Sequence, residues 1–124
     1  MGSLLTTVNV DCSDPAGLAR WWSRVLGDWP VTDDPRGISW ISPTGGFDVL
    51  PLIAFLPVPE AKTVKNRVHL DLSPTGCDQA EELERLLALG ARRVDVGQGD
   101  VPWIVLADPE DNEFCLLARR IDSR

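Results

Sequence analysis

The chain has 124 residues, of which 44% are hydrophobic and 25% are charged. This length and composition are typical of one soluble globular domain with its own core. The formal net charge of −7 argues against binding to nucleic acid or to an anionic membrane, because both are polyanions. No apolar run is long enough to cross a bilayer and no signal-peptide pattern is present, so we expect a cytoplasmic protein.

The first half begins with a strand and an amphipathic helix. Residues 6–12 alternate polar and apolar side chains, which predicts a half-buried strand. A helix should follow between Asp14, a good N-cap, and Gly27, a good left-handed stop. Its apolar stripe has helical spacing and consists of Leu18, Trp21, Trp22, Val25 and Leu26. Three further strands are predicted at residues 29–32, 38–42 and 49–58.

The second half repeats this plan. A strand is predicted at residues 68–73 and a helix at 77–89, ending at Gly90. The helix should bury a stripe of Ala80, Leu83, Leu86 and Leu87, with Glu81 and Arg85 paired at i,i+4 on its outer side. Three strands should follow at residues 92–96, 103–107 and 113–118.

Both helices end in Leu-Gly, and the two Leu-Gly pairs stand 63 residues apart. The sequence therefore predicts an α+β fold of two βαβββ modules, at about residues 4–58 and 67–118, joined by a linker at 59–66. In this alignment Thr7 of the first module stands opposite His69, the only histidine of the chain.

Three spaced motifs carry a family resemblance: 11–15 (DCSDP), 65–72 (KNRVHLDL) and 107–115 (ADPEDNEFC). Together with the paired modules, they resemble the glyoxalase-like domain proteins of the vicinal oxygen chelate superfamily, which also holds bleomycin-resistance proteins and extradiol dioxygenases. The resemblance implies an incomplete barrel around a cavity, with the helices outside, and a homodimer.

The resemblance also implies where a metal would be held, namely by the first and last strand of each module. Those positions here are Thr7, His69, Cys115 and the strand at 49–58, which has no histidine, cysteine or acid. The usual metal site of the superfamily is therefore lost, and we expect no cofactor. A divalent metal is the less favoured alternative, with Asp11, Asp71 or Glu113 rebuilding a site around His69.

Strand alternation predicts which side chains share the cavity face. The candidate ligand-binding residues are Thr7, Asn9, Asp11, Trp40, His69, Asp71, Trp103, Glu113 and Cys115. His69, paired with Asp71 or Glu113, is the candidate general base, although a lone strand histidine is often structural. The three cysteines (Cys12, Cys77 and Cys115) form no CxxC motif and suit reduced thiols, and Cys115 has the apolar neighbours of a cavity-lining residue.

The favoured function is binding of a small organic molecule, serving either sequestration or a metal-free reaction, so whether the chain is an enzyme is left open. A divergent metal-dependent lyase, isomerase or dioxygenase is the second hypothesis. A third is an interaction module whose cavity is filled by its own side chains. The acidic run at 108–112 lacks EF-hand spacing and predicts a turn with an Asx-type cap.

Overall fold

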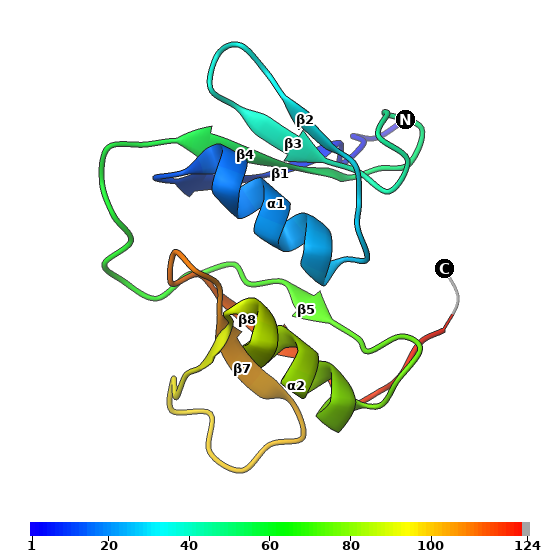
Figure 1. Ribbon diagram of the computed structural model, residues 1–124, viewed down its shortest axis with the longest axis vertical. Helices are drawn as coiled ribbons and strands as arrows, with labels where there is room; N and C mark the ends of the chain where they lie inside the picture. The colour runs from blue at the N-terminus through cyan, green and yellow to red at the C-terminus, as the bar shows by residue number, and fades with distance from the viewer. Residues whose placement is uncertain (123–124) are drawn as a thin grey trace. The chain divides into compact units, whose positions relative to one another are not determined.

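A computed structural model describes residues 1–122 of the chain. The chain divides into two compact units, one up to Ala61 and one from Lys62 on. Each unit carries one helix and four strands in the order β-α-β-β-β (Figure 1).

In the first unit, β1 and β4 run parallel, and β4, β3 and β2 continue the sheet in antiparallel pairs. The helix α1 packs against these strands. The elements are β1 (Thr7–Cys12), α1 (Pro15–Val25), β2 (Val31–Asp33), β3 (Ser39–Ile41) and β4 (Leu52–Pro57).

The second unit has the same topology, with strand order β5-β8-β7-β6 matching β1-β4-β3-β2. Its elements are β5 (Asp71–Leu72), α2 (Gln79–Leu89), β6 (Arg92–Arg93), β7 (Ile104–Ala107) and β8 (Glu113–Leu116). The predicted α+β fold with a repeated βαβββ plan is therefore confirmed. Over residues 1–122 the strand ladders form two separate four-stranded sheets and no closed barrel.

The predicted N-cap and stop of α1 and the predicted stop of α2 are confirmed, whereas α2 begins at Gln79, two residues later than predicted, because Asp78 is its N-cap. The Asp14 carboxylate accepts a hydrogen bond from the Gly17 N–H, and Asp78 and Glu81 form a reciprocal capping box at the start of α2. Gly27 and Gly90 have φ of 91° and 113°, a left-handed conformation that favours glycine. Within the described residues, neither helix has the length and apolarity that a membrane span requires.

Two predictions for α2 are wrong: the ion pair on its outer side, and the burial of Ala80 and Leu87 in its apolar stripe. Arg85 pairs with Glu82 at i,i+3, at 2.7 Å, because Glu81 is engaged in the capping box. Leu86 is fully buried, but Leu87 is 39% exposed. Gln79, Glu82 and Leu86 share one face of α2, and Gln79 donates from it to the backbone carbonyls of Pro102 and Leu116, so this face rather than that of Leu87 is turned inward. Ala80, also predicted to be buried, is exposed.

The opening strand of the second unit is shorter than the predicted 68–73. The strand β5 pairs only with β8, and its register joins Asp71 to Cys115 and Leu72 to Leu116. Val68, the first residue of the predicted strand, precedes this ladder and is 78% exposed. Of the other strands, β2 alone reaches beyond its predicted range, since it starts two residues later and ends one residue later. The remaining strands are shorter than predicted, most clearly β4, which begins at Leu52 rather than at residue 49, and β6, which ends at Arg93 rather than at residue 96.

Candidate functional site

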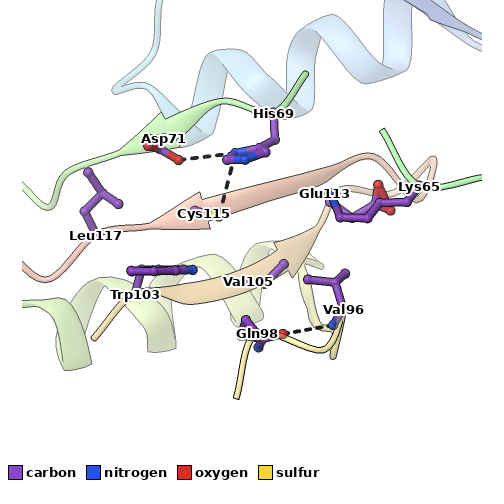
Figure 2. A pocket seen from close by; sticks show the side chains of 10 residues that line it. All are labelled: Lys65, His69, Asp71, Val96, Gln98, Trp103, Val105, Glu113, Cys115 and Leu117. Atoms are coloured by element: carbon purple, nitrogen blue, oxygen red, sulfur yellow. Dashed lines mark hydrogen bonds and ion pairs between the residues drawn. The ribbon is translucent and has the colours of Figure 1, made fainter. Parts of the chain in front are cut away.

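A pocket of about 330 Å³ lies on one face of the second unit's sheet, and all its lining residues come from that unit (Figure 2). Alternate residues of β8 and its continuation contribute Glu113, Cys115 and Leu117, as the strand period requires. The complete lining is Lys65, His69, Asp71, Val96, Gln98, Trp103, Val105, Glu113, Cys115 and Leu117.

The pocket has apolar walls and a compact polar group. The walls are Val96, Trp103, Val105 and Leu117, and the Trp103 side chain stays 40% exposed. The polar group brings together His69, which lies just before β5, Asp71 of β5 and Cys115 of β8. Parallel pairing of β5 with β8 places them together, because Asp71 and Cys115 are direct register partners.

His69 makes both of its polar contacts through one ring nitrogen. Its Nδ1 lies 3.3 Å from Oδ1 of Asp71 and 3.8 Å from Sγ of Cys115. The ring and the Asp71 carboxylate are each about half exposed, whereas Cys115 is buried. Asp71 is therefore the carboxylate that orients the ring, and Nε2 makes neither of these two contacts.

The environment of Cys115 disfavours its thiolate. Burial raises the pKa of the Cys115 thiol, and the negative charge of Asp71 and a hydrogen bond to Asp71 raise it further. A nucleophilic cysteine needs the opposite, a pKa lowered by a neighbouring cation. In the protein alone, Cys115 is thus a neutral thiol that lines the cavity, as the sequence predicted.

Glu113, the other candidate partner of His69, is bound elsewhere. Its carboxylate accepts hydrogen bonds from the Lys62 ammonium and from the Asn66 N–H, both at 2.7 Å. Burial raises the pKa of Glu113, but these two bonds outweigh it and leave the pKa below its ordinary value. Glu113 therefore fastens the segment 62–66 to β8, and Lys65 of that segment lines the pocket.

The turn before β8 is built around a buried acid. Asp108 is 1% exposed, and its Oδ1 accepts the N–H groups of Glu110 and Asn112. The Asn112 amide also donates to this carboxylate. The predicted Asx-type turn is confirmed, and it fixes the point at which β8 begins.

The remaining predicted site residues belong to the first unit. Thr7, Asn9 and Asp11 lie on β1, where the last two are exposed. Trp40 is in β3 and stacks on Phe47, with ring centroids 5.0 Å apart. The second-unit candidates His69, Asp71, Trp103, Glu113 and Cys115 all line the one pocket.

Sequence reasoning did not select Lys62, Val96 or Gln98 for this site. Val96 and Gln98 lie in the loop after β6, where no periodic pattern marks a side chain as inward. Lys62 pairs with a residue 51 positions away in the chain. In the sequence, Lys62 is distinguished only by its closeness to two other basic residues, Lys65 and Arg67.

Comparison with solved structures shows the same fold at low identity. FosX, a fosfomycin resistance protein from Listeria monocytogenes, matches with a TM-score of 0.68 and 16% identity, covering 96% of this chain and 93% of that one. FosX from Mesorhizobium loti matches with a TM-score of 0.64 and 16% identity, over 94% and 91%. A glyoxalase/bleomycin resistance protein/dioxygenase family enzyme from Burkholderia phytofirmans matches with a TM-score of 0.62 and 20% identity, over 92% and 97%.

A search of curated proteins finds no match. The family model described as a glyoxalase-like domain matches residues 7–117, which is nearly the whole chain and includes all the motifs behind the resemblance. The chain therefore belongs to the glyoxalase-like domain family.

Proposed function

We propose that the pocket of the second unit binds a small organic molecule with a flat apolar part and a polar end. The observation that carries this proposal is the division of one cavity into apolar walls and a compact polar group. A volume of about 330 Å³ lies within the range of small-molecule sites, which combine mostly apolar walls with a few oriented polar groups. Trp103 supplies a partly exposed aromatic face for stacking.

Binding of this kind serves either sequestration or a reaction that needs no metal. With Nδ1–H donated to Asp71, the His69 ring has the tautomer in which Nε2 accepts a proton. His69 is then the general base of a metal-free reaction, and Asp71 is the residue that positions it. Sequestration requires only the cavity. The strand β4 (LIAFLP) has no side chain that could bind a metal, but neither sequestration nor a metal-free reaction needs one.

A specific observation favours a second candidate, a metal-dependent lyase, isomerase or dioxygenase. His69, Asp71 and Cys115 each offer one ligand atom, and these atoms all lie within 4.8 Å of one another. FosX from Listeria monocytogenes has been crystallised as a variant complexed with Mn(II) and 1S,2S-dihydroxypropylphosphonic acid. The two candidate functions differ at Nδ1 of His69. In the metal-free function this nitrogen carries a proton, and in the metal-dependent function it binds the metal instead.

A thermal-shift screen of small aromatic and heteroaromatic compounds tests the binding proposal. We expect compounds that raise the melting temperature, with affinity reduced about tenfold by Trp103→Ala and by His69→Ala, since each removes about 1.4 kcal/mol of contact. Val68→Ala is the matched control, because Val68 adjoins His69 but is 78% exposed and outside the pocket lining. Compounds that stabilise all four proteins equally, or a screen with no stabilising compound, would contradict the proposal.

A further inference from the structure

We propose that His69, Asp71 and Cys115 form a binding site for one divalent cation of the zinc class, built from the second unit alone. The inference deepens the proposed function and rests on it only in placing the cation at the polar end of the same cavity. It differs from the arrangement that the family resemblance implies, because Asp71 takes part and no first-unit residue does.

The first argument is geometric. Zinc binds imidazole nitrogen and carboxylate oxygen at about 2.0–2.2 Å and thiolate sulfur at about 2.3 Å, so near-tetrahedral angles hold these atoms roughly 3.3–3.7 Å apart. In the protein, Nδ1 of His69 lies 3.3 Å from Oδ1 of Asp71 and 3.8 Å from Sγ of Cys115. Both distances from Nδ1 are close to this spacing, and the three donor atoms all lie within 4.8 Å of one another, so a small movement of the half-exposed Asp71 side chain would place them around one centre.

The second argument is the convergence on a single ring nitrogen. A cysteine–histidine–aspartate proton relay uses both ring nitrogens, one for the nucleophile and the other for the orienting acid. Here the thiol and the carboxylate both face Nδ1 (Figure 2). Nε2 makes neither contact, so the three groups are not arranged as such a relay, whereas a cation between them would bind one donor atom of each.

The donor set selects the kind of cation. Thiolate and imidazole ligands favour zinc, cobalt and nickel, while manganese, magnesium and calcium prefer sites made of oxygen atoms. Binding requires Cys115 to lose its proton, which passes to the buffer. Three protein ligands leave one tetrahedral position open, as in catalytic rather than structural zinc sites, and the three residues line a pocket that an organic molecule can enter.

The test uses metal alone as the probe, on the full chain purified without a histidine tag and stripped with a chelator. Titration with Co²⁺ should reach one equivalent and produce a thiolate-to-cobalt charge-transfer absorption band. Zn²⁺ should displace the cobalt, and Mn²⁺ should bind at least about 100-fold more weakly. Cys115→Ser should abolish the charge-transfer band and weaken Zn²⁺ binding about 100-fold, and Asp71→Asn should weaken it at least about tenfold.

Cys77→Ser is the matched control, because Cys77 is a free thiol outside the cluster, and its titration should equal that of the unmodified chain. If circular dichroism shows Cys115→Ser to be unfolded, Asp71→Asn decides the test, since its side chain is half exposed. Cobalt binding without a thiolate band, an equal band in Cys115→Ser, unchanged Zn²⁺ affinity in Asp71→Asn, or no binding below millimolar Zn²⁺ would overturn the proposal. If the protein binds no metal but is stabilised by organic compounds through Trp103, the metal site is contradicted and the proposed function is still supported.

Discussion

Asp108→Ala is expected to lower the free energy of unfolding by about 3 kcal/mol, which corresponds to a fall of roughly 10 °C in melting temperature. The carboxylate is buried and accepts the N–H groups of Glu110 and Asn112 as well as the Asn112 amide. Its removal leaves these N–H groups buried without an acceptor. A buried donor without a partner lowers the free energy of unfolding by more than the net contribution of the lost hydrogen bond. Urea unfolding followed by circular dichroism measures the loss.

Two further variants show whether this loss comes from the buried turn. Asp108→Asn keeps one acceptor oxygen and should lose about half as much as Asp108→Ala. Asp95→Ala is the matched control, because Asp95 also accepts a turn N–H, that of Gly97, but in an exposed loop, and it should lose under about 1 kcal/mol. Equal losses for Asp95→Ala and Asp108→Ala would show that the buried network is no stronger than an ordinary surface turn.

Glu113→Gln should destabilise the protein by about 2 kcal/mol at pH 7, and the difference should shrink in acid. The glutamine oxygen still accepts the Asn66 N–H, but Lys62, with its side chain only 18% exposed, loses its counter-charge. Because the pKa of Glu113 in the folded protein lies below the ordinary 4.5, the ion pair stabilises the fold above pH 4.5 and loses this contribution as the pH falls through the folded pKa. Unfolding curves of both proteins between pH 7 and pH 3 measure this dependence.

An exposed ion pair supplies the control for this prediction. Asp122→Asn breaks the pair between Arg120 and Asp122, both about half exposed, and should change stability by less than about 1 kcal/mol at any pH. A double-mutant cycle of Lys62→Met with Glu113→Gln should give a coupling energy above 1 kcal/mol. A coupling near zero, or a Glu113→Gln deficit that persists at pH 3, would mean that the ion pair does not fasten the segment 62–66.

The architecture could be predicted because its signals are local. Caps and stops such as Asp14, Gly27 and Gly90 act within one helical turn, and strand alternation is visible within six residues. The repeat then required the same topology in both halves, and the structure has it. Even the cavity face of β8 followed from the strand period, since Glu113, Cys115 and Leu117 share it.

The pairings within the site depend on contacts between distant parts of the chain, which a local pattern does not encode. The sequence left Asp71 and Glu113 as alternative partners for His69. The distant contacts of Glu113 with Lys62 and Asn66 remove it from this role, and Asp71, two residues from His69, is the acid beside the ring. Likewise, the bond of Glu113 to Lys62 closes a loop of 51 residues. The wrong Glu81–Arg85 pair shows the same limit at short range, because the capping box and the i,i+4 pair compete for one glutamate.

The central claim, a small-molecule site in the second unit, is tested most directly by NMR titration with a compound selected in the thermal-shift screen. The chain has five tryptophans, and Trp103 is the one that lines the pocket, so its indole N–H signal, assigned with Trp103→Phe, reports on the site. We predict saturable shifts of the Trp103 indole and of the backbone signals of His69, Asp71 and Cys115. Saturable binding that leaves these signals unmoved would contradict the account.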